Sequence, residues 1–235
     1  MVIGTRQNCN ARANDPVLYI NNNILQISPC EKLLGVKIDS HLCWGKQVDL
    51  VCSKISSRIY LLSKIKKFLN LESRKLYYSG FILPLMDYCC VIWGNCYTEN
   101  LNRILKLQKR AARLILDADP LAPSAPLFQK LGWMRIEDRI LYHKCILIFK
   151  CLQNNAPSYL KEKISLVSEN NPYQLRNVIN GDLKVPMVRN ELYKKSFSYS
   201  GPYIWNNLPN SIRSVKTISA FKEKLKHHLI INSNV

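Results

Sequence analysis

The spacing of apolar residues changes near Trp44, and this change limits the fold more than any other feature of the chain. From there apolar side chains recur at steps of three or four, at Trp44, Val48, Val51, Ile55, Ile59, Leu62 and Ile65. This spacing places them on one face of a helix. Most of the neighbouring lysines fall off that face, namely Lys46, Lys54, Lys64 and Lys67. We therefore expect a helix with a buried apolar side and a basic outer side.

The residues before Trp44 follow a different pattern of short runs rich in β-branched residues. These runs are 2–4, 17–20, 24–27 and 33–38, and Asn, Asp, Pro and Cys separate them. They predict strands and hairpins, with a turn at 21–23 because asparagine tolerates the left-handed backbone conformation. We expect a short antiparallel hairpin whose exposed edge could dock a protein partner. The predicted fold class is α+β, mostly α, with this hairpin followed by a helical bundle.

A second helix is predicted from about Glu72 to Trp93. Asn70 offers a cap, and Pro84 should kink the helix because proline lacks a backbone donor. Gly94 should end it.

A third helix, from about Glu99 to Leu116, has the most informative charge pattern. At 100° per residue, four cations fall within an arc of about 80°, namely Arg103, Lys106, Arg110 and Arg113. The neighbouring arc holds Leu101, Ile104, Leu105, Ala111, Ala112 and Ile115. Four like charges repel one another unless an anion meets them, so the pattern favours phosphate binding over a merely solvated surface.

The C-terminal half is less regular. Residues 117–126 (DADPLAPSAP) predict a loop, and a helix pair is expected at 135–152 and 158–164. Turns are expected at Asn180–Gly181 and at Gly201–Pro202, and an amphipathic helix at 218–231. Tyr203 and Trp205 could stack on bases, but the favoured interpretation places Trp205 in a core. The expected divisions are 1–43, 44–116, 117–170 and 171–235.

Positive charge is concentrated in two blocks of the sequence. The chain carries 34 Lys and Arg against 16 Asp and Glu, a net charge of +18. Residues 46–116 hold 13 basic against 4 acidic residues, and residues 161–235 hold 12 against 5. Such blocks suit a polyanion, whose binding releases counterions and depends on salt.

Cysteine usage and the longest apolar stretch indicate an intracellular protein. The nine cysteines include no C-x-x-C pair, so we expect reduced thiols in cytoplasm or nucleus. The apolar stretch 81–93 is too short to span a bilayer, and Pro84 and Asp87 interrupt it. We expect no membrane partner.

No catalytic or metal-binding residue is predicted. A polymerase needs carboxylates that hold two divalent ions about 3.5–4 Å apart, and the nearest candidates are Asp117 and Asp119 in a proline-rich loop. Loop residues near a helix end are the favoured interpretation of both. The four histidines are scattered, and no nucleophile motif or glycine-rich phosphate loop is present.

Four strings occur in a fixed order along the chain. They are EKLLGVKID at 31–39, ILPLMDYCCVIWG at 82–94, LQKRAAR at 107–113 and SFSYSGPYIWNNLP at 196–209. Together they resemble the segment after the catalytic palm in reverse transcriptases of non-LTR (LINE-type, jockey-like) retrotransposons. In that family the string around Leu34, Gly35 and Val36 lies in a palm hairpin that grips the primer end, and the later strings belong to the thumb and beyond. Leu33 stands where the family usually has an aromatic residue.

The resemblance implies a template-primer duplex of RNA or DNA as partner. We expect its backbone to meet Lys32 and Lys37 beside the grip and Arg103, Lys106, Lys109, Arg110 and Arg113 on the thumb. The aromatic-x-Asp-Asp motif of the family is absent from this sequence. We therefore expect this chain to hold no cofactor and to be inactive by itself. Mg²⁺ would belong to the catalytic palm. The alternatives are a non-enzymatic protein-interaction module and a functionless retroelement relic.

Overall fold

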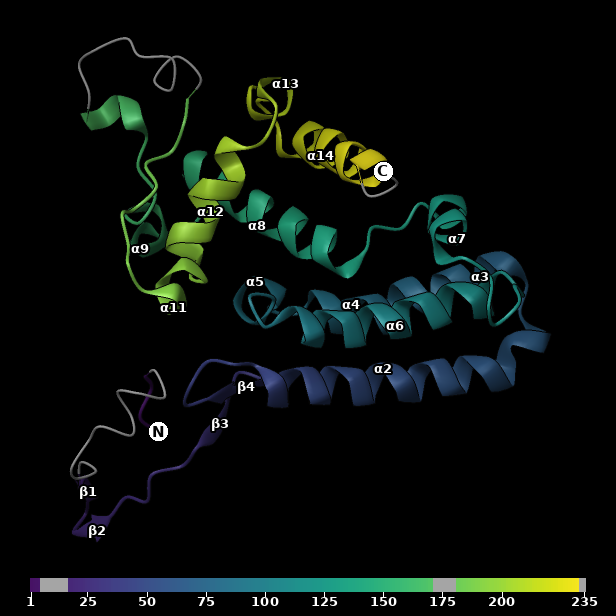
Figure 1. Ribbon diagram of the computed structural model, residues 1–235, viewed down its shortest axis with the longest axis horizontal. Coiled ribbons are helices and arrows are strands. Elements are labelled where there is room, and N and C mark those ends of the chain that lie inside the picture. Colours follow the sequence, from purple (N-terminus) through teal and green to yellow (C-terminus); the bar gives the residue numbers. More distant parts are fainter. Residues whose placement is uncertain (5–16, 171–180, 233–235) are drawn as a thin grey trace.

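The computed structural model describes residues 1–4, 17–170 and 181–232 of the chain. Small antiparallel hairpins lie at one end, and helices make up the rest (Figure 1). The predicted fold class, α+β and mostly α, is confirmed.

Two hairpins form the strand region. β1 (Tyr19–Ile20) pairs with β2 (Asn23–Ile24), and β3 (Cys30–Leu33) pairs with β4 (Val36–Asp39). The asparagine turn is confirmed, with positive φ at Asn21 and Asn22. The run 33–38 is not one strand, because left-handed backbone at Leu34 and Gly35 folds it into a turn. Residues 2–4 form no strand, although the Gly4 amide donates to the Ser40 carbonyl.

α2 (Gly45–Ile65) confirms the helix predicted from Trp44. Its buried residues include the predicted Val48, Val51, Ile55, Ile59 and Leu62. Asp39 sets the entry to the helix, because its carboxylate accepts the backbone N–H groups of Cys43 at 2.9 Å and Trp44 at 2.7 Å. A single carboxylate therefore joins the end of β4 to the start of α2.

The predicted helix at 72–93 is broken into several pieces. After η1 (Lys66–Phe68), Asn70 caps α3 (Leu71–Tyr77) by accepting the Ser73 amide at 2.8 Å. A π-helical turn, η2 (Tyr78–Ile82), precedes α4 (Leu83–Asp87), in which Pro84 occupies the first turn. The sharp break before α5 (Cys90–Trp93) occurs at Cys89, whose φ is 52°. The prediction of one helix over 72–93 is therefore wrong, and the kink expected at Pro84 stays a prediction.

Three longer helices follow. α6 (Thr98–Ile115) and α8 (Ile136–Leu152) confirm the predictions. Residues 117–126 are not all loop, because α7 (Ser124–Leu131) begins before Pro126. Proline is tolerated there since the first turn of a helix leaves its amides without intrahelical partners.

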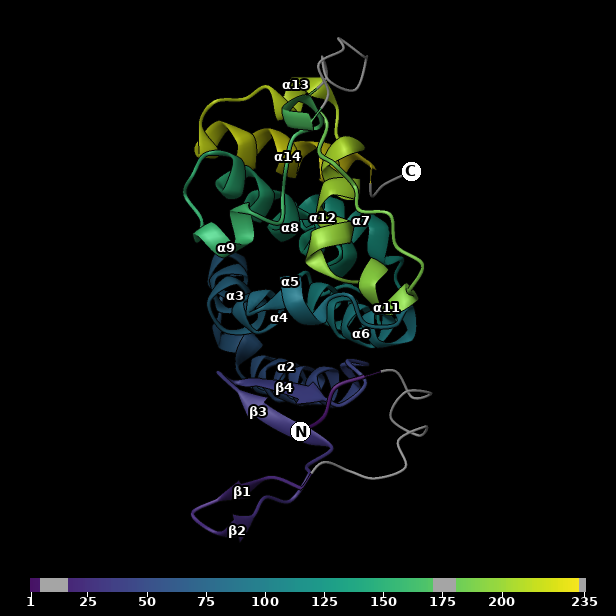
Figure 2. The same cartoon turned by 90° about the vertical axis from the view of Figure 1, so that its left-hand side faces the viewer.

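The C-terminal part wraps around α8 (Figures 1 and 2). It contains α9 (Ser158–Lys161), η3 (Val167–Asn170), α11 (Glu191–Lys194), α12 (Phe197–Asn206), α13 (Asn210–Arg213) and α14 (Ile218–Asn232). The turn expected at Gly201–Pro202 is wrong, because both residues lie within α12. A Cβ on Gly201 would lie 3.3 Å from Ile148, so glycine permits close packing of α12 on α8. Asn180 lies outside the described residues.

Two apolar clusters form the core. The first runs from Val36 through α2, α4 and α6 to Ile140, and the second from Met134 through α8 and α12 to Leu229. Trp205 is buried in the second cluster, as predicted, and stacks on Phe221. α8 contributes to both clusters. The expected domain divisions stay a prediction.

Candidate nucleic-acid interface

The cationic face of α6 is separate from its buried face. Ile104, Gln108, Ala111, Ala112 and Ile115 point into the core. Lys106 and Arg110 are exposed, and Lys109 is half-buried at the edge of the cationic face. α6 therefore presents two cations to solvent near the centre of the predicted stripe, and neither forms an ion pair within residues 1–4, 17–170 and 181–232.

The two ends of the stripe are tied to other elements. The Arg103 guanidinium lies 2.6 Å from a carboxylate oxygen of Asp49 on α2, and both side chains are largely exposed. Arg113 Nε donates to the Ala122 carbonyl at 2.9 Å in the loop before α7. Both arginines thus have structural partners, and sequence spacing did not reveal them because the partners lie outside α6.

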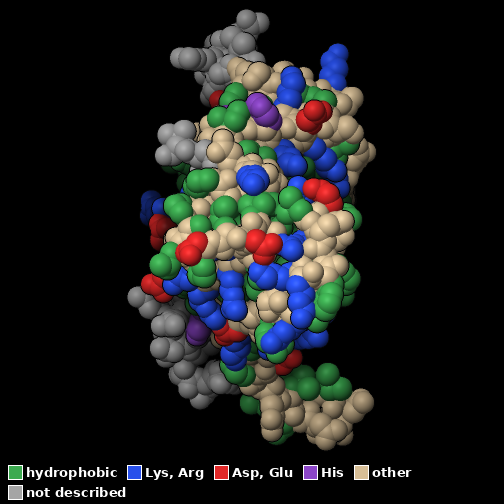
Figure 3. Space-filling model, turned by 90° about the vertical axis from the view of Figure 1, so that its right-hand side faces the viewer, with side chains coloured by type: hydrophobic (Ala, Val, Ile, Leu, Met, Phe, Trp, Pro, Cys, Tyr) green, Lys and Arg blue, Asp and Glu red, His purple; other side chains and the backbone are tan. Residues whose placement is uncertain are grey.

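α2 and α6 lie side by side and run in the same direction (Figures 1 and 2). Asp49 and Arg103 join their first halves, and Lys66 and Asp117, 2.7 Å apart, join the segments just beyond their ends. The parallel arrangement places the string KIKK at 64–67 near the end of α6. Basic side chains gather in a band on this side of the molecule (Figure 3). Lys64 and Lys67 are exposed there, and they were not among the predicted contacts.

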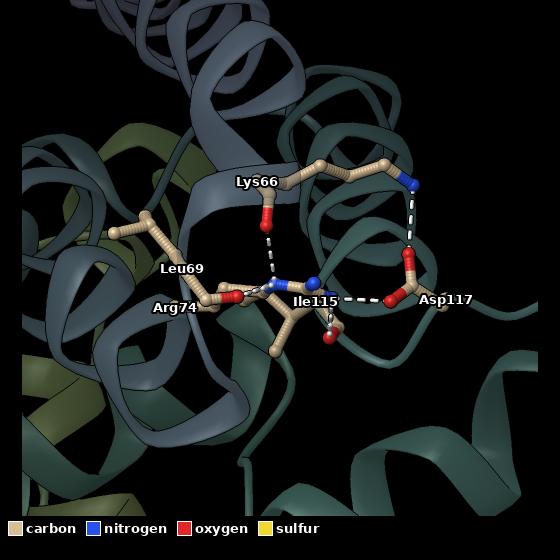
Figure 4. Close-up of polar contacts among 5 residues, drawn as sticks. All are labelled: Lys66, Leu69, Arg74, Ile115 and Asp117. Atoms are coloured by element: carbon tan, nitrogen blue, oxygen red, sulfur yellow. Dashed lines mark hydrogen bonds and ion pairs between the residues drawn. The ribbon is translucent and has the colours of Figure 1, made fainter.

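Arg74 organises this end of the bundle (Figure 4). Its Nε donates to the carbonyls of Lys66 at 3.1 Å and Leu69 at 3.0 Å, and its Nη1 donates to the Ile115 carbonyl at 3.2 Å. Nη1 also contacts the Asp117 carboxylate. Hydrogen bonds from Lys66 and Arg74 lower the pKa of Asp117. Arg74 is therefore a structural residue within a basic surface.

The β3–β4 hairpin lies at the other end of α2. Lys32 and Lys37 are directly opposite each other across the two strands, an arrangement in which like charges repel. The Lys37 amide donates to Gln47 Oε1 of α2 at 2.8 Å. Because Gln47 precedes Asp49 by two residues, the hairpin and the Arg103 end of the stripe meet at the first turns of α2. The two predicted groups of cations, those of the hairpin and those of α6, therefore both lie beside α2.

Leu34, Gly35 and Val36, which were expected to act as a primer grip, lie at the turn of this hairpin. Leu34 is exposed, Gly35 has a φ of 83°, and Val36 is buried against the helices. The Tyr88 hydroxyl donates to the Leu34 carbonyl at 2.6 Å. The string at 82–94 therefore holds the turn of the string at 31–39.

Asp117 and Asp119 are engaged by other groups of the chain and are not arranged as magnesium ligands. The Asp117 carboxylate accepts from Lys66 and Arg74, and Asp119 Oδ1 accepts the Leu121 amide at 2.7 Å. Among the described residues, no group of three or more His, Cys, Asp or Glu side chains could hold a metal ion. Within the same ranges, no helix is long and apolar enough to span a membrane.

Comparison with known proteins finds two relatives from Drosophila melanogaster. A probable RNA-directed DNA polymerase from transposon X-element is 26% identical over 135 residues, which are 56% of this chain and 15% of that protein. A probable RNA-directed DNA polymerase from transposon BS is 28% identical over 116 residues, which are 48% of this chain and 13% of that protein. The matches thus span a small part of each relative. No family model and no solved structure matches the chain.

Proposed function

We propose that this chain, a segment related to the RNA-directed DNA polymerases of non-LTR retrotransposons, binds the backbone of a template-primer duplex and leaves catalysis to other residues. The observation that carries the proposal is the cationic face of α6, where exposed Lys106 and Arg110 stand apart from the core face. Charge of this kind binds phosphates, which positions a protein on a duplex and carries little sequence information.

The contacts follow α2 from one end to the other. Lys32 and Lys37 would meet the backbone beside the hairpin tip, and Arg103, Lys106, Lys109, Arg110 and Arg113 would meet it along α6. Exposed Lys64 and Lys67 extend this surface beyond the predicted residues. Arg103 and Arg113 would hold α6 in place as well as adding charge, since each has a partner in another part of the chain.

The test is binding of the purified chain to an RNA–DNA hybrid as salt is raised. The slope of log affinity against log salt should be about −0.9 for each phosphate contact. Lys106→Glu with Arg110→Glu should weaken binding at least tenfold, and it leaves the structural arginines intact. The slope should become shallower by about two, one for each lost contact.

Lys222→Glu with Lys224→Glu is the matched control. Both lysines are exposed on α14, and the change in net charge is the same. This variant should bind the hybrid like the unmodified chain. Equal losses in both double variants would mean that only net charge matters, and the proposed interface would be wrong.

A protein-interaction module is the second candidate, and the exposed apolar side chains of the hairpins favour it. Tyr19, Ile20, Ile24, Leu33 and Leu34 are all more than half exposed. Unpaired strand edges can accept a strand from another chain. Under this alternative, neither double charge reversal would alter affinity for the hybrid.

A further inference from the structure

Two aromatic rings are exposed at the far end of α2. Tyr60 is 62% exposed, and Phe68 of η1 is 77% exposed. Within the described part of the chain, neither residue belongs to an apolar cluster and neither ring contacts another aromatic ring. Single exposed apolar side chains are common on protein surfaces. What distinguishes these two rings is the charge beside them.

Each ring has a lysine next to it. Lys64 Nζ lies 5.1 Å from the centre of the Tyr60 ring, and Lys67 Nζ lies 5.0 Å from the centre of the Phe68 ring. Neither lysine forms an ion pair with a described residue. Proteins that bind single-stranded nucleic acid combine the same two groups, because cations bind the phosphates and aromatic faces stack on the bases.

Two acidic residues at this end of the bundle are already neutralised by cations. Asp117 accepts hydrogen bonds from Lys66 and Arg74, and Glu72 pairs with Lys75 at 2.8 Å. The end of α2 and η1 lie on the right of Figure 1, which is the side that faces the viewer in Figure 3, where basic side chains form a band. An anionic strand would therefore meet a basic surface around the two rings.

Tyr60 lies on the side of α2 that adjoins the α6 stripe. At 100° per residue, Tyr60 points about 20° away from Asp49 around the helix. The Asp49 carboxylate lies 2.6 Å from the guanidinium of Arg103 on α6. At 1.5 Å per residue, Tyr60 is about 16 Å further along α2 than Asp49, and Phe68 follows the end of the helix. A strand that leaves the α2–α6 surface at this end would pass both rings.

We propose that Tyr60 and Phe68 stack on unpaired bases of a single strand, DNA or RNA, that extends from the duplex, while Lys64 and Lys67 bind its phosphates. The place of the strand rests on the proposed function, but the chemistry does not, because the same groups can bind a free single strand. Every base has an aromatic face, so the site should tolerate any sequence.

The experiment compares two RNA–DNA hybrids as ligands of the full chain. One has an unpaired extension of about six nucleotides, and the other has an abasic extension of the same length, which carries the same phosphates without bases. The extension with bases should bind at least about fivefold more tightly, the smallest gain expected from stacking one base. Tyr60→Ala with Phe68→Ala should make the two hybrids bind equally. Tyr60→Trp with Phe68→Trp should keep the preference, because stacking needs only an aromatic face.

Tyr203→Ala with Phe81→Ala is the matched control. Both rings are more than half exposed and lie on other elements, α12 and η2. This variant should keep the full preference for the extension with bases.

Three outcomes would overturn the proposal. These are equal affinity of the unmodified chain for the two hybrids, an unchanged preference in Tyr60→Ala with Phe68→Ala, and an equal loss in the control variant. The comparison is made with DNA and with RNA extensions, and a preference of at least about fivefold with either supports the site and identifies the strand.

The outcome is separable from that of the proposed function. Lys106→Glu with Arg110→Glu should weaken binding of both hybrids and leave the ratio of their affinities unchanged. If the chain binds no hybrid, free single strands with and without bases are compared in the same way. A preference for bases that Tyr60→Ala with Phe68→Ala removes would then support the stacking site and contradict the α6 interface alone.

Discussion

Asp87 shows how one residue can couple two helices through charge. Its two carboxylate oxygens accept from Nε and Nη2 of Arg139 at 2.5 Å, and His143 Nε2 lies 3.2 Å away. Burial alone would raise the pKa of Asp87, but His143 and Arg139 outweigh burial and lower it from the ordinary value of 3.8. The ionised carboxylate of α4 therefore stabilises its contact with α8.

The lowered pKa predicts a loss of stability in acid. A carboxyl with a depressed folded-state pKa contributes stability above its unfolded pKa, and this contribution is lost as the pH falls through the folded pKa. Unfolding by urea should show a falling free energy of unfolding below about pH 4. Asp87→Asn should cost about 3 kcal/mol at neutral pH, because Arg139 loses its partner, and should flatten the acid decline.

Exposed Glu223 of α14 provides the control for this prediction. Glu223→Gln should leave both the stability at neutral pH and the acid decline unchanged. Parallel pH profiles for Asp87→Asn and the unmodified chain would contradict the assigned role.

At the scale of elements, the contact between α2 and α6 depends on Arg74. Its guanidinium donates to carbonyls that follow α2 and to the last carbonyl of α6, and both sets would lack these donors in Arg74→Met. An unsatisfied buried polar group costs about 1–3 kcal/mol. We expect Arg74→Met to lower the free energy of unfolding by about 3 kcal/mol in urea titrations.

Lys75→Met is the matched change one residue away. Lys75 pairs with Glu72 on its own helix, and a surface pair of this kind contributes about 0.3–0.5 kcal/mol. Equal effects of the two substitutions would show that Arg74 does not join the helices.

Periodicity in the sequence predicted the elements that bury one regular face. α2, α6 and α14 have such a face, and their apolar positions could be located before the structure. α8 is buried around most of its circumference, because it enters both apolar clusters. The break at Cys89 could not be located before the structure, because a positive φ in a non-glycine residue depends on tertiary contacts. Gly201 and Pro202 suggested a turn from local preference, but packing of α12 against α8 keeps them helical.

In the candidate site too, the sequence predicted the features that depend on spacing within one helix and missed those that depend on contacts between helices. The stripe on α6 follows from spacing within one helix, and its exposure at Lys106 and Arg110 agrees with that pattern. The partner of Arg103 lies 54 residues earlier in the chain, and spacing within α6 carries no information about it. Lys64 and Lys67 were not among the predicted contacts, because their place near the end of α6 depends on the packing of α2 against α6.

The whole molecule is held together by α8, which enters both apolar clusters. Ile136 and Ile140 belong to the first cluster, and Ile148 and Phe149 belong to the second. A straight helix shared by two clusters transmits the loss of one to the other. The molecule should therefore unfold in one transition.

Calorimetry can test this coupling with two substitutions in α8. Ile140→Ala and Ile148→Ala remove buried side chains from different clusters, and each should cost about 2–5 kcal/mol. Both variants should keep a single transition at a lower temperature. Two separate transitions, with each substitution moving only one, would show that the clusters unfold independently.

The parallel course of α2 and α6 has an electrostatic consequence for the whole surface. Helix dipoles that point the same way place the negative ends of both helices together, and such an end repels phosphate. Arg74 donates to carbonyls at that end of each helix, and Lys66 lies beside it. One guanidinium thus offsets the negative ends of two dipoles, and the positive potential continues past the helix ends instead of reversing sign there.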